Sequence, residues 1–187
     1  MTPRIRGLHH VTATVDEAQT DVDFCRGLLG LRLVKKTVNF DDPTVYHLYF
    51  GDPAGSPGTI LTFFPYPRAR QGQIGGGQVG TVTFVIPPGS IEFWQERLAW
   101  FGLDAASSER FGESYLLFSD PDGLRLELVE REEGTGGASP LESIPDDRAI
   151  KGLGGAVLLR EDYADTIDVL GNILGLRGVS HAIQCCA

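Results

Sequence analysis

Two adjacent histidines stand in the first strand-like segment of the chain, His9 and His10 in GLHHVTATV (residues 7–15). The segment alternates apolar and polar residues with a period of two, which predicts a β-strand whose neighbouring side chains point to opposite faces. His10 and Thr12 then share one face, and His9 lies on the other. An imidazole among small polar neighbours can bind a metal ion or transfer a proton, and it can equally satisfy local hydrogen bonds, so both interpretations stay open.

A carboxylate occupies a comparable position later in the chain. The segment PDGLRLELVE (residues 121–130) alternates leucine with Arg125, Glu127 and Val129, which predicts a strand with Glu127 on its polar face. Glu127 is either a solvated strand residue or a further metal ligand. A third histidine, His47, lies between two tyrosines in the strand-like VYHLYF, and a structural role is favoured for it.

Helical and strand-like segments recur in a fixed order around these residues. Residues 16–30 predict an amphipathic helix, because Ala18, Val22, Cys25 and Leu29 fall on one face. Three strand-like runs follow, at residues 31–40, 45–50 and 58–64. The same element order then recurs, with a strand at 81–86, a helix at 90–102 and further strands at 114–120 and 124–130. A curved βαβββ sheet presents one face to its helix and the other to a cup, so His10, Thr12 and Glu127 are expected on the cup side.

Direct sequence matches support the repeat. An offset of 145 aligns residues 29–32 with 174–177, both reading LGLR, and an offset of 72 aligns Gly30-Leu31 with Gly102-Leu103. The same offsets place Val82 and Gly155 at the position of His10. We predict an α+β fold of tandem βαβββ modules, two of them complete and a third begun. The predicted boundaries are a first module at 5–66, a second at 78–131, a linker at 132–149, a partial third module at 150–177 and an atypical tail at 178–187.

Composition excludes several classes of partner. The net charge of -9 argues against nucleic acid, because a phosphate-binding surface needs clustered lysine and arginine. No run reaches the roughly 20 apolar residues of a membrane span, and the N-terminus has no apolar signal region. The three cysteines form neither a disulfide framework nor a zinc-ligand spacing. We therefore expect a soluble cytoplasmic protein.

The quoted residues resemble a known family. The βαβββ modules, the PDG turn before ELVE, and GLHHVTATV followed by LGLRLVKKTVNFDDPTVYHLYFGDPAGSPGTILTFFP are similar to the vicinal oxygen chelate superfamily of glyoxalases, bleomycin resistance proteins and dioxygenases. More narrowly, they resemble its ring-cleaving dioxygenases of hydroquinone-type aromatics. The resemblance covers residues 5–177 and is most specific from His9 to Pro65.

The resemblance implies a four-module, metal-dependent enzyme that opens an aromatic diol with O₂ in an extradiol-type cleavage. Its metal is Fe(II), or Mn(II) in its place, held by two histidines and one glutamate. The first metal ligand carries over to His10, and His9 and Thr12 match catalytic positions that line or support the site. The other two ligands belong to a fourth module, so the resemblance implies an N-terminal portion that is inactive alone. Glu127 is retained as a candidate metal ligand on the cup side.

Two other functions are consistent with the same residues. One is a non-catalytic protein that binds a small molecule or confers resistance by sequestering it. The other is a glyoxalase-like lyase or isomerase in which His10 and Glu127 combine with residues of a second subunit. Self-association into a homo-oligomer is expected in any case, because the helix of the partial third module carries an apolar face without most of its sheet.

Overall fold

The computed structural model describes residue 5, residues 7–134, residue 139 and residues 141–180. The first repeat consists of β1 (His10–Val15), α1 (Ala18–Val22), the π-helix η1 (Asp23–Leu28), β2 (Arg32–Val38), β3 (Tyr46–Gly51) and β4 (Ile60–Pro65). The second consists of β5 (Gln78–Ile86), α2 (Ile91–Trp100), β6 (Ala106–Arg110), β7 (Glu113–Ser119) and β8 (Arg125–Glu130). The third has β9 (Gly152–Leu159), α3 (Ala164–Asp168) and the π-helix η2 (Val169–Ile173). The predicted α+β fold, with two complete βαβββ modules and the start of a third, is confirmed. The module boundaries stay predictions, and residues 181–187 of the predicted tail lie outside the described residues.

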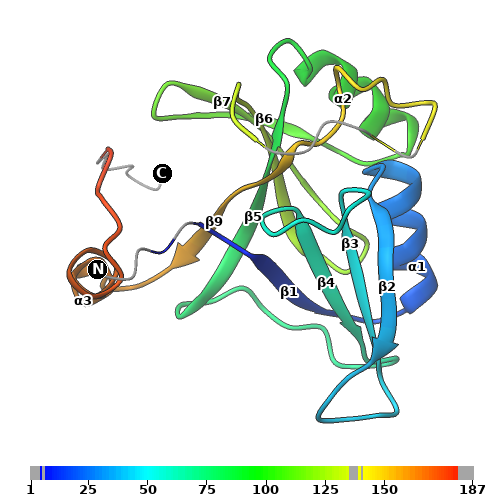
Figure 1. Ribbon diagram of the computed structural model, residues 1–187, viewed down its shortest axis with the longest axis horizontal. Coiled ribbons are helices and arrows are strands. Elements are labelled where there is room, and N and C mark those ends of the chain that lie inside the picture. Colours follow the sequence, from blue (N-terminus) through cyan, green and yellow to red (C-terminus); the bar gives the residue numbers. More distant parts are fainter. Residues whose placement is uncertain (1–4, 6, 135–138, 140, 181–187) are drawn as a thin grey trace.

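The strands form two sheets (Figure 1). Sheet A has the order β1-β4-β3-β2, and sheet B has the order β6-β7-β8-β5-β9. In each complete module the first strand pairs in parallel with the fourth, and the remaining neighbours are antiparallel. β9 extends sheet B by pairing antiparallel with β5. The third module therefore begins as an edge strand of the second.

The two parallel ladders show which residues are equivalent. Thr12 lies beside Thr62 in sheet A, and Thr83 lies beside Glu127 in sheet B. Counting two residues back from each threonine, Thr81 takes the place of His10. The sequence offset that assigned Val82 to this place was wrong, because residues 87–90 make the strand-to-helix loop longer in the second module than residues 16–17 do in the first.

The first helix changes its winding along its length. The predicted single helix is an α-helix that continues as a π-helix, with the Leu29 amide donating to the Phe24 carbonyl at 3.1 Å. Cys25 and Leu29 are buried as predicted, at 0% and 1% exposure. A π-turn contains an extra residue, so the buried stripe widens beyond the predicted one. Asp21, in the α-helical part before this turn, is only 1% exposed.

Arg97 of α2 connects the modules. Its guanidinium donates to the carbonyls of Leu28 at 2.7 Å and Gly27 at 2.6 Å, at the end of η1, and to the carbonyl of Ser143 at 3.4 Å. A cation at the C-terminal end of a helix is stabilised by the exposed carbonyls and the helix dipole. This buried arginine therefore joins the first module, the second module and the linker.

Close backbone approach explains part of the glycine content of β9. A Cβ on Gly154 would lie 2.9 Å from Cγ2 of Val85, and one on Gly152 would lie 2.8 Å from the carbonyl oxygen of Gly58. These two positions exclude a side chain because β9 packs tightly on its neighbours. Gly155 has nothing within 4 Å of an added Cβ, so packing does not require glycine there.

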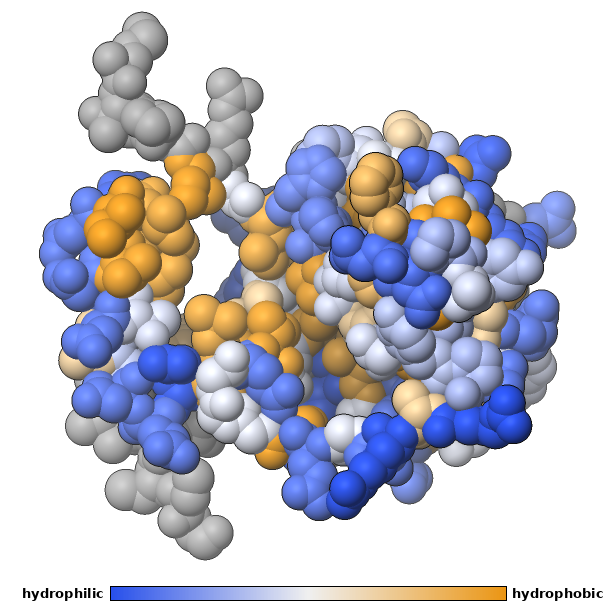
Figure 2. Space-filling view, turned by 90° about the horizontal axis from the view of Figure 1, so that it is seen from below, coloured by the Kyte–Doolittle hydropathy of each residue, from blue (hydrophilic) through white to orange (hydrophobic). Residues whose placement is uncertain are grey.

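The helical part of the third module stands away from both sheets (Figure 1). Neither α3 nor η2 has a buried residue, and apolar side chains gather on this lobe (Figure 2). Ile167 is 54% exposed and Ile173 is 72% exposed. Among the described residues, no helix has both the length and the apolar character needed to cross a membrane.

Candidate functional site

The strands of sheet A present a polar and aromatic surface on the side opposite the buried core, which we term the cup face of sheet A. Strand pairing places these residues on it: Arg32, Lys35 and Thr37 of β2; His47 and Tyr49 of β3; Ile60, Thr62 and Phe64 of β4; and His10, Thr12 and Thr14 of β1. His10 and Thr12 therefore share this face, as the sequence predicted. None of these strand positions holds an aspartate or a glutamate.

His9 and His10 contact each other directly. Their Nδ1 atoms are 3.1 Å apart, and their rings meet edge to face at 85° with both side chains exposed. A hydrogen bond between two Nδ1 atoms requires one ring to donate and the other to accept. The contact fixes the tautomers relative to each other and leaves the Nε2 atom of His10 for another partner.

Thr12 is held by a neighbour on the same face. The Thr62 hydroxyl donates to the Thr12 hydroxyl at 2.8 Å, and Thr62 is completely buried while Thr12 is exposed. The buried hydroxyl thus orients the exposed one next to His10. Thr12 therefore lies on the same face as His10, and its role there stays a prediction.

His47 also belongs to the cup face, although its sequence context favoured a structural role. Its ring centroid lies 4.1 Å from those of Tyr49 and Phe64, and its Nδ1 atom is 2.9 Å from the Tyr49 hydroxyl. Burial, with His10 and then Lys35 nearby, lowers the pKa of His47 below 6.5. The sequence could have predicted that His47 and Tyr49 lie on the same face, because residues two apart in a strand share a face.

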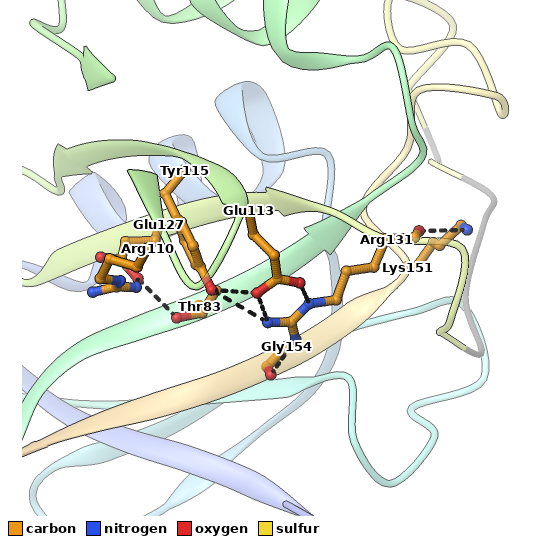
Figure 3. Close-up of polar contacts among 8 residues, drawn as sticks. All are labelled: Thr83, Arg110, Glu113, Tyr115, Glu127, Arg131, Lys151 and Gly154. Atoms are coloured by element: carbon orange, nitrogen blue, oxygen red, sulfur yellow. Dashed lines mark hydrogen bonds and ion pairs between the residues drawn. The ribbon is translucent and has the colours of Figure 1, made fainter. Parts of the chain in front are cut away.

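Glu127 lies on sheet B and is already engaged (Figure 3). Its carboxylate is 2.6 Å from Nη2 of Arg110 and accepts a hydrogen bond from the Thr83 hydroxyl at 3.0 Å. The Glu127 side chain is 4% exposed. A buried carboxylate with these two partners is compensated within its own sheet.

A second ion pair lies beside the first (Figure 3). Arg131 bonds both carboxylate oxygens of Glu113, at 2.6 Å and 2.8 Å, and the Tyr115 hydroxyl donates to Glu113 at 2.7 Å. The hydrogen bond from Arg131 lowers the pKa of Glu113 to about 2, so the pair is ionised at neutral pH. Arg131 also donates to the Gly154 carbonyl at 3.0 Å, which connects this network to β9.

The predicted metal ligands are therefore not all brought together. His10, Thr12 and the adjacent His9 form one group on sheet A, whereas Glu127 lies on sheet B with Arg110. Within the part of the chain that the structure describes, no group of three His, Cys, Asp or Glu side chains is placed to hold a metal ion. The described residues alone do not fit a centre of two histidines and one glutamate.

Two buried carboxyl groups at the module junction were not anticipated. Asp21 of α1 and Asp120, in the turn after β7, are 1% and 5% exposed, and one oxygen of each has no hydrogen-bond partner among the described residues. Burial, followed by the charges of Asp122, Asp120 and Asp16, raises the pKa of Asp21 to about 8. Burial likewise raises the pKa of Asp120 to about 6. The only sequence signal was that Asp21 is four residues before Cys25 on the apolar helix face.

The tandem βαβββ architecture is typical of one fold superfamily. Residues 7–128 match the family model "Glyoxalase/Bleomycin resistance protein/Dioxygenase superfamily". The chain belongs to this superfamily, as its resemblance indicated.

Similar proteins carry related names. The chain is 54% identical over 179 residues to "Putative ring-cleaving dioxygenase MhqO" of Bacillus subtilis (strain 168), covering 96% of this chain and 57% of that protein. It is 41% identical over 155 residues to "Chlorohydroquinone/hydroquinone 1,2-dioxygenase" of Sphingobium indicum, covering 80% of this chain and 48% of that protein. A crystal structure of a "putative dioxygenase" from B. subtilis subsp. subtilis str. 168 superposes with a TM-score of 0.91 at 54% identity, over 93% of this chain and 56% of that one. The chain thus spans about half the length of these relatives.

Proposed function

We propose that this chain provides part of a metal-dependent, extradiol-type ring-cleaving dioxygenase that acts on hydroquinone-like aromatics with O₂. The observation that carries the proposal is the His9–His10 pair on β1, with Thr12 on the same face as His10, in a chain similar to relatives named as ring-cleaving dioxygenases. Fe(II), or Mn(II) in its place, is the metal that we propose for this centre. A metal of this kind supplies open coordination positions for the diol and O₂.

Each of the three proposed site residues has a distinct task. His10 presents the Nε2 atom of an exposed imidazole on the cup face as the first metal ligand. His9 holds the Nδ1 atom of that ring at 3.1 Å and so restricts its orientation and tautomer. Thr12, fixed by Thr62, offers a hydroxyl two residues from His10 for positioning the substrate.

Ligand counting leads us to propose that activity needs residues beyond those described. A facial triad needs three protein ligands, and the cup face of sheet A offers His10 with no carboxylate. Glu127 stays a candidate ligand only if its bonds to Arg110 and Thr83 are exchanged for the metal. We therefore propose that the chain is inactive alone and that the ring-cleaving centre forms when a further βαβββ module faces sheet A.

Oxygen uptake tests this function. The 187-residue chain and a longer version with the additional modules of its relatives are reconstituted anaerobically with Fe(II), desalted, and mixed with hydroquinone and O₂. We expect ring-opened product and oxygen consumption from the longer version alone. Turnover by the 187-residue chain would show that Glu127 or a second subunit supplies ligands, and no turnover by either version would overturn the proposal.

A further inference from the structure

Permanent positive charge gathers on the cup face of sheet A without a matching carboxylate. Arg32 and Lys35 project from β2, both are exposed, and no strand position of this face holds an acidic residue. The chain as a whole carries a net charge of -9, so this local excess runs against its overall charge. An uncompensated cationic surface in an acidic protein attracts anions.

Aromatic rings lie next to these cations. The rings of Tyr49 and Phe64 flank that of His47, with interplanar angles of 34° and 36°. The Nζ atom of Lys35 lies 5.4 Å from the centre of the Tyr49 ring. All three ring-bearing side chains are partly exposed, so a flat apolar surface and a cation are available side by side.

One polar atom of this group lacks a partner. His47 uses its Nδ1 atom for the Tyr49 hydroxyl, whereas its Nε2 atom is buried and has no hydrogen-bond partner among the described residues. Leaving a buried polar atom unsatisfied is unfavourable. The atom is covered in this arrangement, so a ligand on this face contacts the aromatic rings and not the Nε2 atom.

We propose that the cup face of sheet A binds an aromatic carboxylate that also carries ring hydroxyl groups. The carboxylate lies at Lys35, and the ring packs on Tyr49 and Phe64. This assignment rests on the proposed function for the hydroxylated ring, and it adds the carboxylate as the group that selects the substrate. Sheet B offers no such surface in its Glu113 and Glu127 network, because an arginine pairs with each carboxylate there.

Ligand titration of the 187-residue chain tests the proposal in oxygen-free buffer with a chelator. The probe is 2,5-dihydroxybenzoate, and binding is followed by the amide chemical shifts of β2, β3 and β4. We expect a Kd on the order of 1 mM, since an exposed ion pair and a ring contact each contribute little. Hydroquinone, which lacks the carboxylate, and cyclohexanecarboxylate, which lacks the aromatic ring, should each bind about fivefold more weakly.

Two matched pairs of variants locate the ligand. Lys35→Met should weaken binding about fivefold, whereas Lys36→Met should not change it, because Lys36 lies on the other face with its Nζ atom 3.9 Å from the centre of the Tyr46 ring. In the same way, Tyr49→Leu should weaken binding and Tyr46→Leu should not. The amide spectra of the free variants show whether each one is folded.

The results separate this proposal from the enzymatic one. The chelator removes any metal, so binding of the probe does not depend on whether the dioxygenase function is correct. Equal binding of all three probes, equal effects of Lys35→Met and Lys36→Met, or no saturation at concentrations on the order of 10 mM would overturn the assignment of the aromatic carboxylate. Turnover of hydroquinone by the longer version together with any of these results would leave the dioxygenase function standing alone.

Discussion

The two sheets use their cup faces in opposite ways. On sheet B, Glu127 and Glu113 are paired with Arg110 and Arg131 at 2.6 Å. On sheet A, no strand position of the cup face holds a carboxylate beside the cations and imidazoles, and His10 is exposed. Paired charges fill the first surface and stabilise it, whereas unpaired groups leave the second available for a ligand. The same module therefore serves the fold in one copy and leaves a surface open to a ligand in the other.

One pair of equivalent positions shows how the difference arises. Thr62 and Glu127 each lie beside a threonine of the first strand, Thr12 and Thr83 respectively. Both form a hydrogen bond to that threonine, at 2.8 Å and 3.0 Å. Glutamate adds a buried charge that needs Arg110, and this requirement fills the cup of sheet B. Threonine adds none, so the cup of sheet A stays free.

The largest expected effect comes from breaking the charge pairing of sheet B. Arg110→Met leaves the Glu127 carboxylate buried with only the Thr83 hydroxyl, so the free energy of unfolding should fall by about 3 kcal/mol. Urea denaturation measures the change, and Arg125→Met, an exposed arginine of the same sheet, should alter stability by less than about 0.5 kcal/mol. Replacing both partners, Arg110→Met with Glu127→Leu, should recover most of the loss. If the two arginine variants behaved alike, sheet B would not depend on its buried pair.

The junction between the modules should respond to pH. The folded-state pKa of Asp21 is about 8, above the ordinary 3.8, so the folded state holds a proton that the unfolded state releases. Its contribution to stability is complete below pH 4 and is lost as the pH rises through 8, with a slope of up to about 1.4 kcal/mol per pH unit in between. Asp21→Asn, which mimics the protonated form, should flatten the urea midpoint between pH 6 and 8. Asp23→Asn, an exposed neighbour bonded to Gln19, is the control, and parallel curves for the two variants would contradict the assignment.

A smaller effect is expected where sheet B holds the third module. Arg131→Met removes the hydrogen bond to the Gly154 carbonyl and the pairing with Glu113, which should cost about 1.5 kcal/mol. Hydrogen exchange should accelerate in β9 more than in β7 or β8. Uniform acceleration across sheet B would mean that Arg131 stabilises the whole sheet instead of fixing β9.

Period-two alternation and the repeated element order were enough to predict the modules and the shared face of His10 and Thr12. Side-chain pairing was not predictable in the same way. Glu127 alternates with leucine as a free cup-facing carboxylate would, and only the fold brings Arg110, which is 17 residues away, to 2.6 Å from it. Asp21 lies four residues before Cys25 on the apolar face of the helix, and its burial comes from packing at the module junction, which the periodicity of one helix does not describe. The sequence therefore located the surface, and long-range contacts decided which of its charges are free.

The smallest effect on stability, and the sharpest on function, is expected on sheet A. His10 is exposed and is not part of the buried core. His10→Ala should therefore change the free energy of unfolding by less than about 0.5 kcal/mol. It should nevertheless abolish the metal affinity of β1, because the lost imidazole is the proposed ligand. Broadening of amide signals by added Mn(II) detects even weak binding, and signals near His10 should broaden in the unmodified chain and sharpen in the variant. His47→Ala is the matched control on the same face, and it should leave the broadening nearly unchanged, since His47 uses Nδ1 for Tyr49 and its Nε2 atom is buried. Equal loss of broadening from both substitutions would show that the cup face as a whole attracts the metal. The assignment of His10 as the metal ligand and of His47 as part of the aromatic group would then be wrong.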